Sequence, residues 1–363
     1  MTESKPSLPV SAADIEAAAK VVAPFAVRTP LLSFPVLDER AGTKVFLKPE
    51  MLQRTGSFKF RGAFNKLSSI PQANRGGGVV AFSSGNHAQG VAAAAKILNM
   101  QATIVMPADA PLSKRERTKS YGAEVVLYDR DKEDREAIAG GIASKRGATL
   151  VRPYDDPFVI AGQGTAGREI AEDMAALGLM PDIVVAPASG GGLIAGQGTA
   201  GREIAEDMAA LGLTPDIVVA PASGGGLIAG VATAVKARYP QDQVIVAEPA
   251  GYDDHALSLK VGHREAHAVA PRTICDALMA MMPGELTFAI NSKLLANGVN
   301  ASDEEVGAAV AFAYRELKLV VEPGGAIGLA ALLAGRIDAK GKNVVIVLSG
   351  GNVDADLFAK LVA

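Results

Sequence analysis

The sequence predicts an α/β fold built on mostly parallel sheet. Short runs rich in β-branched residues alternate along the chain with amphipathic segments of about ten residues or more. Strands separated by helices of that length imply βαβ units, whose strands run parallel. The chain has 363 residues and is 49% hydrophobic, which favours two domains over one. The predicted strands are Lys44 to Leu47, Gly78 to Phe82, Ala102 to Met106, Glu124 to Tyr128, Ile217 to Ala220, Gln243 to Ala247 and Asn343 to Leu348.

A helix is expected before the first strand. Ser11-Ala-Ala-Asp14 has the order of a capping box, in which a serine and an acidic side chain three residues later satisfy free backbone N–H groups. An Ala-rich segment follows and runs to about Val22. Pro30 then interrupts the helical pattern. The sequence therefore predicts one capped helix ahead of the alternating elements.

Charge and composition bound the class of partner. The formal net charge is -3 and Lys and Arg are spread along the chain, which argues against nucleic acid or a membrane surface and favours a small-molecule substrate. No apolar run reaches the length of about 18 residues that a membrane span needs, and the opening residues lack the order of a signal peptide, so we expect a cytoplasmic protein. Cys275 is the single cysteine and cannot form a disulfide within the chain.

The chain contains a tandem duplication. Residues 162–195 recur as residues 196–229 with one change, Met180 to Thr214. Solenoid folds need about three or more repeats, so two nearly identical copies indicate a duplication inside an existing domain. Each copy has the pattern helix, strand, Gly-rich loop. We expect the fold to accommodate one extra unit of this kind and one copy to be redundant.

Four segments place small polar residues after predicted strands. The first is Thr55-Gly-Ser-Phe-Lys59-Phe-Arg-Gly62. A lysine between apolar neighbours loses solvation, which lowers its pKa and suits it to Schiff-base chemistry. A surface lysine at the start of a helix is the alternative, and for a lysine taken alone it is the commoner case.

The second segment is Ser83-Ser84-Gly85-Asn86-His87-Ala88-Gln89-Gly90, between a strand and an Ala-rich helix. Ligands of open α/β sheets lie at the carboxyl ends of strands, where a turn that opens a helix presents backbone N–H groups to an anion. The segment therefore predicts a site for a substrate carboxylate. A helix N-cap formed by Ser83 or Ser84 is an equally simple interpretation.

The third segment is Ser223-Gly-Gly-Gly-Leu227, with a twin at Ser189 to Leu193. Successive glycines let the backbone wrap a phosphate, and the helix that follows adds N–H donors. The residues match neither a Walker loop nor a Rossmann fingerprint. A tight strand-to-helix turn is the alternative.

The fourth segment is Ser349-Gly-Gly-Asn352, which follows the strand that ends at Leu348. Its serine hydroxyl is placed to contact a ligand ring. A simple β-turn is the alternative.

Together and in this order, the four segments resemble the fold-type II pyridoxal 5'-phosphate (PLP) enzymes, which are tryptophan synthase β-like, and specifically the threonine/serine dehydratase and serine racemase group. The resemblance extends from about Thr29 to Val353. It implies a large domain of residues 1–54 and 151–363, a small domain of residues 55–150 that closes over the substrate, and a homodimer or higher homo-oligomer.

The resemblance also implies roles for single residues. Lys59 holds the cofactor and removes the Cα proton of the substrate. Asn86 faces the phenolic oxygen of the cofactor, and Ser83, Asn86 and His87 lie near the substrate. Ser349 faces the pyridine nitrogen, where a neutral hydroxyl favours elimination over transamination.

The Gly-rich loop is implied to hold the cofactor phosphate. The residues are Ser223, Gly224, Gly225, Gly226 and Leu227 in the second copy, or Ser189, Gly190, Gly191, Gly192 and Leu193 in the first. We favour the second copy, because its loop runs directly into the expected helix Val231 to Lys236.

The sequence departs from the family in two places. Serine replaces the first glycine of the loop, and Cys275-Asp-Ala277 stands where many relatives have a small residue, Asp and Gly.

Glu248-Pro-Ala-Gly-Tyr252-Asp-Asp254 resembles the Mg²⁺ or Mn²⁺ site of racemase-like relatives. There a Glu, an Asp and an intervening backbone carbonyl are ligands, which implies Glu248, Tyr252 and Asp254 here. Such hard oxygen ligands suit these ions. A solvated acidic turn after a strand is the alternative.

The implied reaction is elimination of the β-hydroxyl of a small amino acid. L-threonine would give 2-oxobutanoate and ammonia, and L-serine would give pyruvate and ammonia. Ser84 stands where racemase-like relatives have a second acid/base, so serine racemase and 3-hydroxyaspartate dehydratase are alternatives. A cysteine synthase-like β-replacement and a non-catalytic PLP or amino-acid-binding protein are less favoured, the latter because Lys59, Asn86 and Ser349 are all retained.

Overall fold

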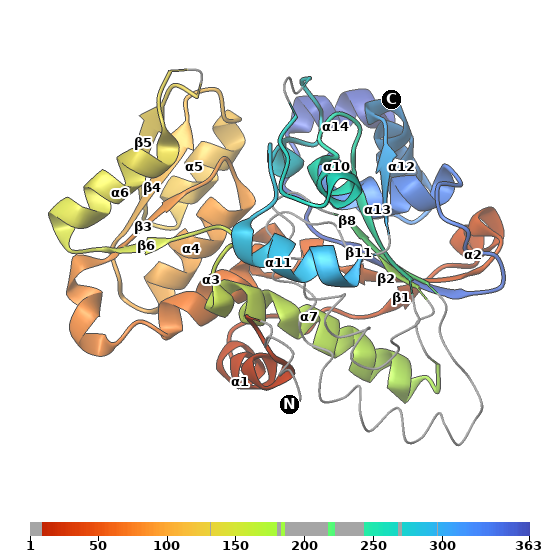
Figure 1. Ribbon diagram of the computed structural model, residues 1–363, viewed down its shortest axis with the longest axis horizontal. Helices are drawn as coiled ribbons and strands as arrows, with labels where there is room; N and C mark the ends of the chain where they lie inside the picture. The colour runs from red at the N-terminus through yellow and green to blue at the C-terminus, as the bar shows by residue number, and fades with distance from the viewer. Residues whose placement is uncertain are drawn as a thin grey trace.

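The computed structural model describes residues 9–130, 132–179, 183–185, 217–221, 243–267, 271–295 and 297–363. Two lobes lie side by side, each with mainly parallel sheet covered by helices (Figure 1). This arrangement confirms the α/β prediction. All seven predicted strands are present, with ends within two residues of the predicted ones. No helix in the described part of the chain combines the length and apolar character that crossing a membrane requires.

The small lobe has one four-stranded parallel sheet in the order β5-β4-β3-β6. Its Ala-rich helix α4 lies close against α3. Gly90 permits this close approach, since a β-carbon there would be only 3.1 Å from the carbonyl of Lys59. The elements are α3 (Lys59–Ser68), η3 (Gln72–Gly77), β3 (Val79–Phe82), α4 (Asn86–Ile97), β4 (Ala102–Pro107), α5 (Leu112–Ser120), β5 (Glu124–Tyr128), α6 (Arg135–Arg146) and β6 (Thr149–Val151).

The strands of the large lobe fall into two sets, β1-β2-β11-β7 and β10-β9-β8, in which only the short β1 is antiparallel. The strands are β1 (Leu32–Ser33), β2 (Lys44–Pro49), β7 (Ile183–Val185), β8 (Ile217–Pro221), β9 (Gln243–Pro249), β10 (Asn297–Ala301) and β11 (Asn343–Leu348). The sequence did not predict β1, β6 or β10, which are short or contain Gly and Asn.

Helices cover this lobe, and one of them forms its core. Ten successive residues of α13 are buried, from Pro323 to Leu332. The helices are α1 (Ala12–Val22), α2 (Pro35–Ala41), η1 (Glu50–Leu52), η2 (Arg54–Gly56), α7 (Pro157–Ala176), α10 (Asp254–Val261), η5 (Asp276–Leu278), α11 (Glu285–Leu294), α12 (Asp303–Arg315), α13 (Pro323–Leu333) and α14 (Ala355–Val362). Helix α1 begins with the predicted capping box of Ser11 and Asp14.

Both copies of the duplication contribute a strand to the large lobe. The first copy forms most of α7 and then β7, which pairs with β11. The second copy forms β8, which pairs with β9. The two strands also contact each other. Each copy of the duplicated unit therefore places one strand in the lobe.

A buried ionic network joins α3 to α7. The guanidinium of Arg61 donates to Glu50 and to Glu169, at 2.8 Å from an oxygen of each. The ammonium of Lys48 is 2.9 Å from Glu169. Burial disfavours the charge on Arg61, but the two carboxylates outweigh it and raise its pKa. Because Arg61 follows Lys59 by two residues, the network fixes the start of α3.

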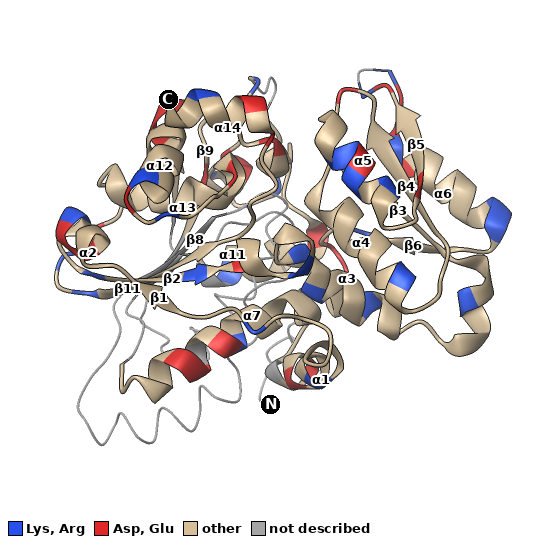
Figure 2. Cartoon of the chain, turned by 180° about the vertical axis from the view of Figure 1, so that it is seen from behind, with Lys and Arg blue, Asp and Glu red and all other residues tan. Residues whose placement is uncertain are grey.

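Charged side chains are distributed over both lobes. Figure 2 shows Lys and Arg as well as Asp and Glu on the helices of each lobe. This distribution agrees with the small net charge of the sequence.

Candidate active site

Lys59 is the first residue of α3 and is buried, with 2% of its surface exposed. Its ammonium donates to the carbonyl of Pro153 at 3.2 Å and lies 5.1 Å from the centre of the Phe58 ring. Burial lowers the pKa of this amine to about 7. The lysine stands at a helix start, as the surface interpretation required, but its burial rules that interpretation out. It is suited to act as a nucleophile and as a base.

The segment Ser83 to Gly90 joins β3 to α4 beside this lysine. Ser83, Ser84, Asn86 and His87 line the same pocket as Lys59. The N-cap of α4 is Gly85, and no side chain caps the helix, so the N-cap interpretation of the two serines is wrong. Burial, and next to it the charge of Lys59, lower the pKa of His87 to about 3. His87 is therefore a neutral imidazole at physiological pH.

Asn86 is held by two side chains of the large lobe. Its amide nitrogen donates to Glu322 Oε1 at 2.5 Å, and its oxygen accepts from Asn352 Nδ2 at 2.7 Å. Asn352 also donates to the carbonyl of Thr55 at 2.9 Å. The amide of Asn86 is thus fixed in one orientation by partners on both sides. The contact of Glu322 with Asn86 was not predicted from the sequence.

The turn after β11 packs against the loop that precedes Lys59. The carbonyl of Ser349 accepts from the N–H of Phe58 at 3.1 Å, and Ser57 forms a bridge with Gly350. A β-carbon at Gly350 would lie 2.1 Å from Glu322 Oε1, so any side chain there would displace Glu322. The Ser57 hydroxyl is buried, and no residue in the described ranges forms a hydrogen bond with it. The turn after β11 therefore packs against the segment before Lys59 and against Glu322, and it is more than an isolated β-turn at the surface.

An ammonium between the lobes completes this side of the pocket. Lys114 of α5 is buried and lies 2.6 Å from Asp276 Oδ2 and 3.6 Å from Glu322 Oε2. Burial opposes its charge, but the two carboxylates outweigh that effect and raise the pKa of Lys114. Burial raises the pKa of Glu322. Sequence reasoning missed Lys114, because no local pattern marks a lysine that meets partners more than 160 residues away.

Two arginines also line the pocket. Arg130 pairs with Asp109 at 3.0 Å. The guanidinium of Arg135 lies 5.4 Å from the centre of the Phe82 ring, and among the described residues no carboxylate forms an ion pair with it. A cation that is not neutralised by the protein can bind an anionic group of a ligand.

Both candidate phosphate loops, Ser189 to Leu193 and Ser223 to Leu227, lie outside the described residues. The strands that precede them are described. β7 pairs with β11, the strand that ends beside Ser349, whereas β8 pairs with β9, the strand that carries Glu248. The strand pairing therefore favours the loop of the first copy as the phosphate site. The helix expected after the second loop, Val231 to Lys236, favours the second copy instead.

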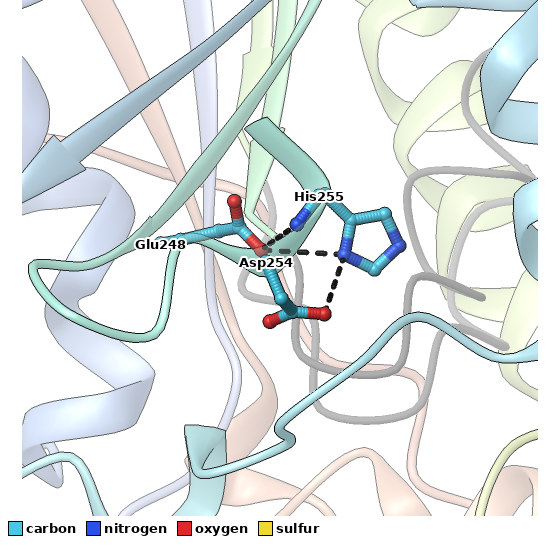
Figure 3. A group of neighbouring side chains, drawn as sticks. All are labelled: Glu248, Asp254 and His255. Atoms are coloured by element: carbon cyan, nitrogen blue, oxygen red, sulfur yellow. Dashed lines mark hydrogen bonds and ion pairs between the residues drawn. The ribbon is translucent and has the colours of Figure 1, made fainter. Parts of the chain in front are cut away.

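The predicted metal ligands Glu248 and Asp254 come together, and a residue that the sequence analysis did not name joins them (Figure 3). His255 Nδ1 lies 3.2 Å from Glu248 Oε1 and 3.5 Å from Asp254 Oδ2. All three side chains are fully buried, so the interpretation as a solvated acidic turn is wrong. Tyr252 is also buried, but the contribution of its carbonyl stays a prediction.

Burial shifts the pKa values of this cluster. Burial, together with the neighbouring Asp254, raises the pKa of Glu248. Burial also raises the pKa of Asp254. For His255 burial opposes the charged form, but the two carboxylates outweigh it and raise its pKa. The three groups thus form one strongly coupled buried unit.

Comparison with known proteins gives a consistent result. The sequence model of a family described as "Pyridoxal-phosphate dependent enzyme" matches residues 22–197 and 193–350, so that each matched piece contains one copy of the duplication. An L-threo-3-hydroxyaspartate ammonia-lyase of a Pseudomonas species is 41% identical over 96% of this chain and 97% of its own. An L-threonine ammonia-lyase of Thermotoga maritima is 38% identical over 96% of this chain and 77% of its own. The structure of maize serine racemase superposes with a TM-score of 0.81, at 34% identity, over 97% of this chain and 96% of its own.

Proposed function

Because the chain belongs to the family of pyridoxal-phosphate dependent enzymes, we propose that it eliminates the β-hydroxyl of a small hydroxy amino acid to give a 2-oxo acid and ammonia. The observation that carries the proposal is the buried amine of Lys59, which shares a pocket with Ser83, Ser84, Asn86 and His87. When bound, pyridoxal 5'-phosphate supplies an electron sink for the negative charge that develops at Cα. The orphaned hydroxyl of Ser57 and the tight turn at Gly350 fit a ligand that lies against these segments.

Each residue of the pocket has a separate role in the proposed reaction. The amine of Lys59 anchors the cofactor and then takes the proton from Cα, for which a pKa of about 7 is well matched to neutral pH. Asn86, held by Glu322 and Asn352, keeps the cofactor ring in place. Ser83 and the neutral His87 receive the substrate carboxylate. Ser349 contributes a neutral hydroxyl to the ring nitrogen, which favours elimination.

The visible absorption spectrum tests the assignment. Protein incubated with pyridoxal 5'-phosphate should acquire the absorbance of lysine-bound cofactor, which should change on addition of L-threonine or L-serine. Formation of 2-oxobutanoate or pyruvate is then followed directly. Lys59→Ala should lose both signals, with Lys66→Ala, farther along the same helix and paired with Asp156, as the control. A Lys59→Ala protein that still gives product would refute the proposal.

A second candidate substrate is a hydroxy amino acid with a second carboxylate, such as 3-hydroxyaspartate. Arg135 favours it, because its guanidinium lines the pocket without an ion-pair partner among the described residues. A charge-assisted hydrogen bond to the second carboxylate is worth roughly 1.5–3 kcal/mol. Arg135→Ala should therefore raise KM for 3-hydroxyaspartate by about 10- to 100-fold, while KM for L-threonine changes little.

Arg146→Ala, at the other end of α6, is the matched control for this variant. An equal change of KM for both substrates would remove the second candidate and leave elimination itself untouched.

Racemisation is a separate activity that Ser84 favours. The hydroxyl lines the pocket together with Lys59, so the two residues are candidates for the two acid/base groups that racemisation needs. L-serine should then yield some D-serine, and Ser84→Ala should abolish D-serine while pyruvate formation continues. If the wild-type protein forms no D-serine, the second activity is excluded.

A further inference from the structure

Three methionines lie where the Lys59 pocket continues into an outer cleft. The segment Met279-Ala-Met-Met282 holds three of the ten methionines of the chain. It joins η5 to α11, and Met279 lines the pocket of Lys59. Met281 and Met282 line the outer cleft, which shares Met279 and Tyr154 with that pocket. A substrate that reaches Lys59 through this cleft passes both methionines.

The side chains of Met281 and Met282 are open to solvent, with 42% and 39% of their surfaces exposed. The single cysteine, Cys275, is buried, and burial raises the pKa of its thiol, so that it keeps its proton. Peroxides oxidise the thiolate form of cysteine. Buried methionines in the described part of the chain are Met100, Met106 and Met174. The thioethers of Met281 and Met282 are therefore the most accessible sulfur groups within the described ranges.

The backbone that follows the two methionines is held in place. The carbonyl of Pro283 accepts from Arg264 Nε at 2.8 Å. The N–H of Leu286 donates to Asp155 Oδ1 at 3.2 Å. A β-carbon at Gly284 would lie 2.7 Å from the same carboxylate oxygen. Because these contacts use the backbone, a chemical change at the two exposed side chains leaves them intact.

The outer cleft also contains a guanidinium that can respond to such a change. Arg135 lines both the outer cleft and the Lys59 pocket, and no carboxylate among the described residues forms an ion pair with it. The thioether of methionine is only a weak hydrogen-bond acceptor, whereas a sulfoxide is polar. An oxygen added at Met281 or Met282 would therefore place a new acceptor in the cleft that Arg135 lines.

We infer that Met281 and Met282 form a modification site, at which a hydroperoxide converts the thioethers to sulfoxides and so hinders entry of the substrate. The sulfur lone pair attacks one oxygen of the peroxide, the O–O bond breaks, and the other oxygen leaves as water, or as an alcohol from an organic peroxide. Sulfur is oxidised and the peroxide is reduced. Methionine sulfoxide reductases reverse the change. The effect on the substrate rests on the proposed function, because the sulfoxide oxygen competes with a substrate carboxylate for Arg135.

Peptide mapping by mass spectrometry tests the modification site without reference to the reaction. The full-length protein, loaded with pyridoxal 5'-phosphate, is treated with increasing amounts of hydrogen peroxide and then digested. The peptide that contains Met281 and Met282 should gain the mass of oxygen first, and methionine sulfoxide reductase should remove it. Oxygen uptake at Met100, Met106 or Met174 before that peptide would overturn the inference.

Kinetics before and after peroxide test the consequence for the substrate. Oxidation should raise KM for the amino acid by roughly tenfold and leave kcat nearly unchanged, since a charge-assisted hydrogen bond is lost from binding. Leucine has nearly the volume of methionine and no sulfur, so the double variant Met281→Leu, Met282→Leu should keep the same KM before and after peroxide. Met51→Leu, in the half-buried η1, is the matched control and should stay as sensitive as the wild type.

The outcomes separate this inference from the proposed function. Oxidation of both methionines with no change in KM would overturn their role in substrate entry. Equal sensitivity of the double variant and Met51→Leu would assign the loss of activity to another group and refute the inference. A wild-type protein that forms no 2-oxo acid would refute the proposed function, while peptide mapping still decides whether the two methionines are the modification site.

Discussion

The ammonium of Lys114 lies 2.6 Å from Asp276 Oδ2, and this ion pair joins helix α5 of the small lobe to the large lobe. The same ammonium lies 3.6 Å from Glu322 Oε2, while the other oxygen of Glu322 accepts from Asn86. A chain of polar contacts therefore runs from the boundary between the lobes to the residue that faces the candidate cofactor site. Through this chain, the relative position of the lobes and the orientation of Asn86 are linked.

Replacing Lys114 should weaken both the fold and the site. Lys114→Ala leaves the buried carboxylate of Glu322 without its cation, and removing one partner of a buried pair costs about 3 kcal/mol or more. Urea unfolding should show that loss, and the affinity for pyridoxal 5'-phosphate should fall as well. Lys119→Ala, on the same helix in an exposed pair with Glu116, should change the free energy of unfolding by less than about 1 kcal/mol. Equal effects of the two variants would contradict this prediction.

Covalent capture of the cofactor should depend on pH through Lys59. Burial lowers the pKa of Lys59 to about 7, and only the neutral amine is a nucleophile. The rate of capture should rise about tenfold per pH unit below pH 7 and level off above it. Stopped-flow absorbance measures this rate. A rate that keeps rising to pH 10 would show that the lysine has an ordinary pKa.

The lowered pKa of Lys59 also makes the free energy of unfolding depend on pH. The unfolded chain binds a proton on this lysine up to about pH 10.5, whereas the folded protein releases it near pH 7. Between these values the unfolded state holds more protons, so the contribution of Lys59 to the free energy of unfolding rises with pH. Below pH 7 the full penalty for burying the charge is present. Lys59→Met should remove this part of the pH dependence in urea titrations.

A side chain at Gly350 should disturb the contact between Glu322 and Asn86. The β-carbon of Gly350→Ala would lie 2.1 Å from Glu322 Oε1, and Glu322 would have to move away from Asn86. We expect cofactor affinity to fall by tenfold or more, which a spectroscopic titration measures. Gly140→Ala is the matched control, because a β-carbon there meets no atom within 4 Å and the residue lies inside helix α6. The control should be neutral or slightly stabilising.

The two Gly-rich loops can be distinguished by placing a charge in each. A carboxylate repels the phosphate of the cofactor. Because β7 pairs with β11 beside Ser349, Gly191→Asp should reduce cofactor affinity more than Gly225→Asp. A larger loss of cofactor affinity in Gly225→Asp would instead identify Ser223 to Leu227 as the phosphate loop, as the order of elements in the sequence suggests. The cofactor titration used for Gly350 applies to both variants.

Local patterns in the sequence accounted for much of the fold. The capping box at Ser11 and the β-branched runs predicted α1 and seven strands, because capping and alternation depend on neighbouring residues. The same reasoning placed Lys59, Asn86 and Ser349 at the ends of strands or the start of a helix. The boundaries of the two domains, the oligomeric state and the cytoplasmic location stay predictions.

Other features depended on contacts between distant parts of the chain. The sequence allowed Ser83 and Ser84 to cap α4, and only the folded chain shows that the N-cap is Gly85. Glu322 reaches Asn86 across 236 positions, which no local pattern reveals. His255 stands next to Asp254 in the sequence, but its contact with Glu248 depends on the direction in which the ring points at the start of α10.

The sequence by itself determined the α/β class and the family, because these depend on residue types in a fixed order, and it predicted which lysine holds the cofactor. Tertiary structure decided which charges are buried, which two carboxylates share the ammonium of Lys114, and which copy of the duplicated strand lies beside β11. The two copies differ at one position, so the chain carries almost no information that separates them. Their places in the sheet are set by the strands they pair with, since hydrogen bonding and burial depend on position in space.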